Sequence, residues 1–122
     1  MDKAELKRRT QKFSVSIIKF LETIPDSRTA RVLSNQLIRS ATSIGANYRS
    51  ACKAKSNADF INKIVIVEEE ADESIYWLEL IEQTVNTDLT RLSLLKKEAD
   101  ELTAIFTAIG KTAKQNQKIF KS

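Results

Sequence analysis

The lysines and arginines are the residues of this chain best suited to chemistry, because such side chains contact the phosphates of nucleic acids. Thirteen of the twenty lie in three short stretches, residues 1–12, 49–63 and 111–122, which hold only three of the sixteen acids. Phosphate contacts position a protein without reading bases, and no basic stretch is studded with aromatic residues for stacking. We therefore predict a surface that binds RNA or DNA backbones with little sequence preference, formed by Lys3, Lys7, Arg8, Arg9, Lys12, Arg49, Lys53, Lys55, Lys63, Lys111, Lys114, Lys118 and Lys121. The alternative is a solvated basic face without a polymer partner.

A second charged set combines Arg39 with a run of acidic residues at 68–73. Arginine satisfies a carboxylate through two parallel hydrogen bonds, and a paired buried charge fixes the register of neighbouring helices. We expect a buried structural network made of Arg39, Ser43, Asn47, Glu70 and Glu73. The alternatives are a ligand-binding or catalytic carboxylate cluster and a Mg²⁺ site built from carboxylate oxygens.

Other residue types argue against an enzyme. The chain has no histidine, which removes the usual general base and the commonest metal ligand. It has no Gly-rich phosphate loop and no cysteine pair for zinc. Its one cysteine, Cys52, cannot form an internal disulfide, which fits a reducing compartment. We expect no catalytic residue, no cofactor and no metal.

The elements that must position these side chains are long helices. Two glycines and one proline among 122 residues are too few for a turn-rich β protein, and 42% hydrophobic residues suffice for one core. No stretch approaches the roughly 20 apolar residues that span a bilayer, so we expect one soluble, cytoplasmic domain over residues 1–122 with no membrane partner.

Apolar residues at three- and four-residue spacing predict helices at about 4–23, 28–53, 57–84 and 89–114, with a fraying tail after about Lys114. Pro25 ends the first helix, the segment Pro25-Asp26-Ser27 contains a candidate N-cap for the second, and Ser56 or Asn57 caps the third. Gly45 lies within the second helix, which indicates close approach of another helix or tolerated local weakness.

Short connections between such helices predict an all-α, antiparallel up-down-up-down four-helix bundle. In that topology the start of the first helix, the end of the second, the start of the third and the end of the fourth share one pole. The three basic stretches would therefore meet at that pole.

The third helix is apolar on more than one side. Its main stripe leaves out several large residues, which a monomeric bundle cannot all cover: Ile61, Val65, Ile66, Tyr76, Trp77 and Leu80. Adjacent helical positions point about 100° apart, so Tyr76 and Trp77 cannot both face the core. We predict an oligomer interface that includes Ile66, Tyr76 and Trp77.

The central part of the chain resembles a known family. The stretch LSNQLIRSATSIGANYRSA at 33–51 and the stretch DFINKIVIVEEEADESIYWLELI at 59–81 resemble the bacterial four-helix-bundle family, also called the 23S ribosomal RNA intervening-sequence protein family. The resemblance extends more loosely from about Phe13 to Lys114. It is carried by the ordered set Arg39, Ser40, Ser43, Asn47, Phe60, Glu70, Glu73, Tyr76 and Trp77.

The resemblance implies a small bundle that assembles into homopentamers and has no known active site. Family members are similar to proteins encoded within ribosomal RNA insertions. A distant relative is a basic accessory subunit of retroelement reverse transcriptases, which makes such an enzyme a candidate protein partner. Two functions stay open: a non-enzymatic oligomer that binds nucleic-acid backbones, and a structural module that binds an acidic protein without nucleic acid.

Overall fold

The chain folds into four helices and the short segments that connect them. The computed structural model describes residues 1–121, with side chains through residue 117. The helices are α1 (Lys3–Leu21), α2 (Arg28–Cys52), α3 (Asn57–Thr84) and α4 (Leu89–Lys121), and residues 1–121 contain no strand. The all-α expectation is confirmed.

The predicted end of α4 is wrong, because the helix continues through Lys121 instead of fraying after Lys114. Residues 114–121 hold no glycine or proline, and their lysines and glutamines favour helix.

Side chains at the helix starts set the other boundaries. Ser27 accepts a hydrogen bond from the backbone N–H of Ala30, and Ser56 accepts one from Asp59, as expected of N-caps. Asp2 accepts the corresponding bond from the Glu5 N–H at the start of α1. Each cap satisfies a backbone donor that the helix itself leaves without a partner.

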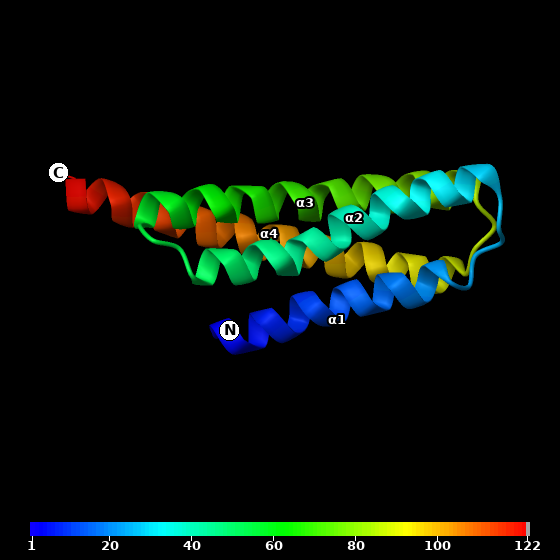
Figure 1. Ribbon diagram of the computed structural model, residues 1–122, viewed down its shortest axis with the longest axis horizontal. Helices are drawn as coiled ribbons and strands as arrows, with labels where there is room; N and C mark the ends of the chain where they lie inside the picture. Colours follow the sequence, from blue (N-terminus) through cyan, green and yellow to red (C-terminus); the bar gives the residue numbers. More distant parts are fainter. Residues whose placement is uncertain (122) are drawn as a thin grey trace.

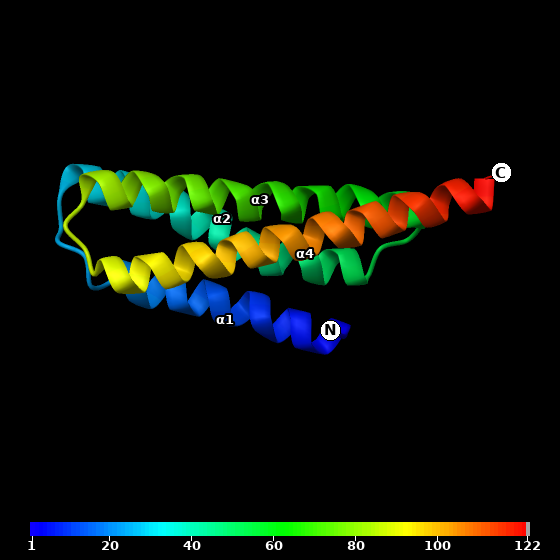
Figure 2. The same cartoon turned by 180° about the vertical axis from the view of Figure 1, so that it is seen from behind.

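The helices lie side by side as a bundle (Figures 1 and 2). The N-terminus, the α2–α3 connection and the end of α4 lie at one end of the molecule, and the other two connections lie at the opposite end. Helix α2 packs most extensively on α3, and α3 on α4, whereas α1 packs more sparsely on α2 and least on α4. Helices α1 and α3 are not neighbours, so they are diagonal across the bundle.

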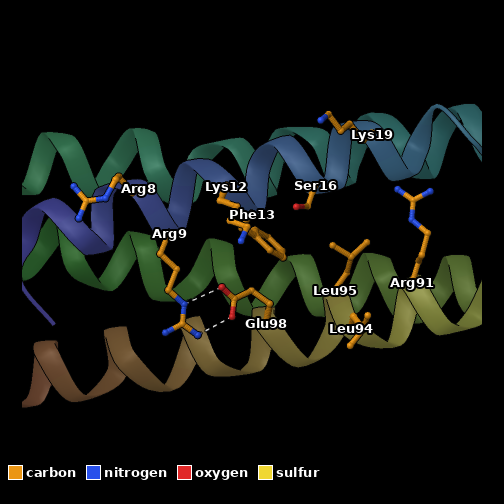
Figure 3. A pocket seen from close by; sticks show the side chains of 10 residues that line it. All are labelled: Arg8, Arg9, Lys12, Phe13, Ser16, Lys19, Arg91, Leu94, Leu95 and Glu98. Carbon is orange, nitrogen blue, oxygen red and sulfur yellow. Dashed lines mark hydrogen bonds and ion pairs between the residues drawn. The ribbon is translucent and has the colours of Figure 1, made fainter.

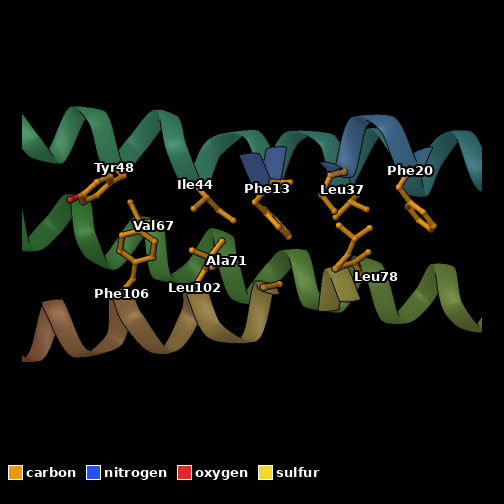
Figure 4. Packing of buried hydrophobic residues seen from close by; sticks show 14 of the residues in the cluster. Phe13, Phe20, Leu37, Ile44, Tyr48, Val67, Ala71, Leu78, Leu102 and Phe106 are labelled. Carbon is orange, nitrogen blue, oxygen red and sulfur yellow. The ribbon is translucent and has the colours of Figure 1, made fainter. Parts of the chain in front are cut away.

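All four helices contribute to one apolar core (Figure 4). Phe13 and Phe20 of α1 pack with residues such as Leu37 of α2 and Leu78 of α3, at the positions the apolar stripes predict. The expectation for Ile61 is wrong, because the chain itself covers this side chain and leaves it 7% exposed. None of the described helices is both long enough and apolar enough to cross a membrane.

Gly45 marks a close helix contact. A Cβ atom at this position would lie 3.2 Å from Oγ1 of Thr10 in α1, closer than ordinary van der Waals contact. The prediction of close approach at Gly45 is therefore confirmed, and α1 is the helix that approaches.

Candidate nucleic-acid interface

The basic residues named from the sequence lie on segments that the fold brings to one end of the bundle (Figure 1). Eight of their side chains are exposed: Lys3, Arg8, Lys12, Arg49, Lys53, Lys55, Lys111 and Lys114. Lys7, Arg9 and Lys63 are partly covered. The side chains of Lys118 and Lys121 lie outside the described residues. We call this set the basic end.

A pocket of about 250 Å³ between α1 and α2 joins two of the three basic stretches. Lys7 of α1 and Arg49 of α2 both line it, together with the hydroxyl residues Ser14 and Thr42. The pocket exists where small residues let the helices approach, and the Ser14 hydroxyl donates to the Ala41 carbonyl across the contact at 3.1 Å. The Lys7 ammonium and the Arg49 guanidinium are suited to a phosphate, whereas the Ser14 and Thr42 hydroxyls already donate to backbone carbonyls.

Two cations of the predicted set already have carboxylate partners. Arg9 donates to both oxygens of Glu98 on α4 at 2.8 and 2.7 Å, and to Glu101 at 3.0 Å. These bonds lower the pKa of Glu98 below its usual value, chiefly through the hydrogen bond from Arg9. The structure therefore places Arg9 in the contact between α1 and α4, a role the sequence analysis missed.

Lys63 is the second paired cation. Its ammonium lies 3.2 Å from Asp59, one turn earlier on α3. The Lys55 N–H also donates to Asp59, and these two donors lower the pKa of its carboxyl group, the backbone donor most strongly. Asp59 thus neutralises part of the charge at the α2–α3 connection.

A groove of about 760 Å³ runs between α1 and α4 (Figure 3). Its cations are Arg8, Arg9, Lys12 and Lys19 from α1 and Arg91 from α4, and its floor includes Phe13, Leu94 and Leu95. Arg91 also lies over the Phe20 ring, 5.7 Å from the centroid. We call this feature the α1–α4 groove.

Lys19 and Arg91 lie outside the three basic stretches, so the cationic surface continues past the basic end along the side of the bundle. The spacing of these cations in the sequence indicates the continuous surface. Arg8, Lys12 and Lys19 follow i, i+4, i+11 spacing, which places them on one helix face.

The polar network around Arg39 forms at the surface instead of in the core. The Arg39 guanidinium contacts Glu70 at 3.2 Å and also pairs with Glu73, yet its side chain is 48% exposed. Ser43 and Asn47 donate to carbonyls one turn earlier on their own helix and do not join the ion pairs. The expectation of burial is wrong because an arginine on this edge of α2 reaches the carboxylates from the solvent side.

The buried polar contact between α2 and α3 is a different one. The hydroxyl of Ser74 donates to Ser40 at 2.9 Å, and both serines are fully buried. Ser74 was missed, although its position on the buried face of α3 indicated it.

The three residues predicted at an oligomer interface differ in exposure. Ile66 and Tyr76 are 42% and 55% exposed. Trp77 is partly covered by its own chain: it packs against the core, donates through Nε1 to Glu73 at 3.2 Å, and lies edge-on to Tyr76. The surface available to another molecule at these positions is therefore mainly that of Ile66 and Tyr76.

The acidic run at 68–73 lies on α3, where the sequence left a Mg²⁺ site as an alternative. Among the side chains that the structure describes, no three His, Cys, Asp or Glu residues gather in an arrangement suited to a metal ion.

The four packed helices define a small helical-bundle protein. The chain belongs to the 23S rRNA-intervening sequence protein family, whose pattern matches residues 2–108. It is similar to a solved protein of unknown function from the S23 ribosomal protein family of Bacteroides thetaiotaomicron, with 35% identity and a TM-score of 0.82. That match covers 91% of this chain and 99% of the other. No curated protein matches the chain.

Proposed function

We propose that the protein is a non-enzymatic, homo-oligomeric bundle whose basic end binds the backbone of RNA or DNA with little sequence preference. The α1–α2 pocket carries this proposal, because Lys7 and Arg49 come from separate basic stretches and line one cavity. A chain that merely scattered its charge for solubility has no need to gather cations from two helices around one pocket.

The chemistry of the basic end favours phosphates over bases. Its exposed groups are flexible lysines and arginines, which contact phosphate oxygens, and no exposed aromatic residue accompanies them among the described side chains. Assembly should strengthen binding to the polymer. In the homopentamer that the family resemblance implies, several copies contact one polymer, so the affinity of the assembly exceeds that of one copy.

Fluorescence anisotropy with generic RNA and with duplex DNA tests the proposal. We expect binding at about 50 mM salt that weakens steeply as salt rises, because each neutralised phosphate releases counterions. Lys7→Glu, Lys53→Glu and Lys114→Glu, combined in one variant, should abolish binding while the helical signal and the oligomer mass stay intact. Loss of assembly in that variant would assign these residues a structural role instead.

A charge-matched control separates the basic end from net charge. Arg28→Glu, Arg31→Glu and Lys97→Glu change the charge by the same amount, but the first two lie by the α1–α2 connection at the opposite end. This variant should bind polymer much more strongly than the first one. Equal losses would mean that net charge alone drives binding. No binding by the wild type at about 50 mM salt would reject the nucleic-acid function and leave an acidic protein as the partner to test.

A further inference from the structure

The α1–α4 groove includes an apolar surface that phosphate binding does not use. Its floor is apolar, and Leu94 within it is 64% exposed. Its α1 rim carries Arg8, Lys12 and Lys19, none of which has an ion-pair partner among the described side chains. A leucine floor beside a row of cations fits an amphipathic surface whose charged residues are acidic.

The outer face of α3 has the complementary chemistry. Glu69, Asp72 and Glu79 are exposed and have no ion-pair partner among the described side chains. Tyr76 lies between the last two and is 55% exposed. The other acids of α3 are occupied within the chain, for example Glu82 by Lys96.

The spacings of the two charged rows agree. At 1.5 Å per residue, Arg8, Lys12 and Lys19 lie about 6 and 10.5 Å apart along α1. Glu69, Asp72 and Glu79 lie about 4.5 and 10.5 Å apart along α3. The rows match only when the two helices run in the same direction, because reversing one of them sets a long interval against a short one.

The two rows cannot meet within one molecule. Helices α1 and α3 are diagonal in the bundle and are not neighbours, and the three acidic side chains of α3 are exposed instead of covered by other helices. Only another copy of the chain can bring them together.

We propose that the α1–α4 groove of one copy receives the outer face of α3 from the next copy. Arg8, Lys12 and Lys19 then face Glu69, Asp72 and Glu79. In this register Tyr76 falls opposite Ser16, a small residue that lines the groove between Lys12 and Lys19. The tyrosine ring covers the apolar floor in the space that Ser16 leaves.

The contact is head-to-tail, because each copy offers a groove to one neighbour and an α3 face to another. Such a contact produces a ring if the rotation between copies closes and a filament if it does not. The parallel match keeps all bundles pointing the same way, so the basic ends of every copy lie on one face of the assembly. This inference rests on the proposed self-assembly, and it assigns Arg8 and Lys12 of the basic end to the contact between copies instead of to phosphates.

Two charge-reversal variants test the pairing by light scattering after size exclusion. The groove variant carries Lys12→Glu and Lys19→Glu, and the α3 variant carries Asp72→Lys and Glu79→Lys. We expect the wild type to form an oligomer and each variant alone to run as a 13.8 kDa monomer. An equimolar mixture should form larger species than either variant alone, because opposite charges face each other wherever the two variants alternate.

Arg28→Glu with Lys97→Glu is the matched control and should keep the wild-type mass, since neither residue lines the groove. Tyr76→Ala is a second test, and it changes no charge. It should raise the protein concentration at which half of the chains are assembled by at least tenfold. Circular dichroism checks that every variant is folded; if the groove variant is not, the α3 variant and Tyr76→Ala carry the test.

Three results would overturn the pairing. These are a monomeric wild type, folded charge-reversal variants that keep the wild-type mass, and two monomeric variants whose mixture stays monomeric. A monomeric wild type whose groove variant alone loses RNA binding would assign the groove to a nucleic-acid strand. Failure of the proposed nucleic-acid function looks different, because RNA and DNA binding would be absent while the masses follow the expected pattern.

Discussion

Helix α1 and the α2–α3 pair differ in how they are held. Helices α2 and α3 share the most extensive contact in the bundle, reinforced by the buried Ser40–Ser74 hydrogen bond. Helix α1 has fewer contacts with both of its neighbours, and its ribbon diverges from the others toward the N-terminus (Figure 1). The comparison indicates that α2 and α3 fix the fold, whereas α1 is an attached helix that carries much of the chain's accessible positive charge.

The same substitution made in both regions gives the largest expected effect. Leu78→Ala empties a fully buried site in α3 and should cost about 4–5 kcal/mol, the upper part of the range for such changes. Leu6→Ala, at the start of α1, should cost about 2–3 kcal/mol, because α1 packs more sparsely on its neighbours and can collapse more easily around the lost atoms. Urea unfolding measures both, and equal costs would contradict the difference between the regions.

The close contact of α1 with α2 is the next target. Gly45→Val adds a branched side chain where even a Cβ lies 3.2 Å from Oγ1 of Thr10, so we expect a loss of about 1–3 kcal/mol. Thr10→Ala in the same chain removes the atoms that clash and should recover part of the loss. The size of that recovery, taken from a double-mutant cycle, reports the contact itself. Purely additive effects would show that the valine acts through helix propensity alone.

The ion pair between α1 and α4 should matter less. Arg9→Ala removes three hydrogen bonds to Glu98 and Glu101, but solvent reaches these groups, so the expected cost is about 0.5–1 kcal/mol. Arg8→Ala is the matched control, since Arg8 has no ion pair among the described side chains, and it should cost less. Thermal unfolding at neutral pH compares the two.

The pH dependence of stability gives a second test of the Arg9→Ala variant. Arg9 lowers the pKa of Glu98 in the folded state, so the stabilisation is complete above the unfolded-state pKa of about 4.3. It is lost as pH falls through the lower folded-state pKa. The wild type should therefore lose stability more steeply than Arg9→Ala below about pH 4. Parallel curves for the two proteins would show that Arg9 contributes nothing through Glu98.

The helices were predictable because each one carries an apolar stripe, and the order of elements then follows from short connections. Three of the four helix starts, Arg28, Asn57 and Leu89, agree with the sequence prediction. The end of α4 was not predictable from apolar spacing, because residues 114–118 include no apolar residue that continues the stripe. Ile61 was misplaced because spacing alone does not give the rotation of α3 against its neighbours.

The candidate sites were less predictable, for a related reason. Charges were grouped by nearness in sequence, whereas a helix gathers them by face, so Lys19 was left out although it shares a face with Arg8 and Lys12. The pair formed by Arg9 and Glu98 joins residues 89 positions apart, and it depends on how α1 rotates against α4. No local pattern carries that information.

The smallest effect is expected at Arg39, where the sequence resembled the family most closely. Its guanidinium bridges to Glu70 and Glu73, but it is 48% exposed, so solvent screens both pairs and Arg39→Ala should cost less than about 0.5 kcal/mol. Ser74→Ala is the informative partner variant, because it leaves the buried Ser40 hydroxyl without its inter-helix partner and should cost about 1 kcal/mol. If thermal unfolding gives the reverse order, the surface ion pairs and not the buried serines hold α2 against α3. The stability of the central pair would then depend strongly on salt, whereas a contact made by buried hydroxyls and apolar side chains leaves it nearly unchanged.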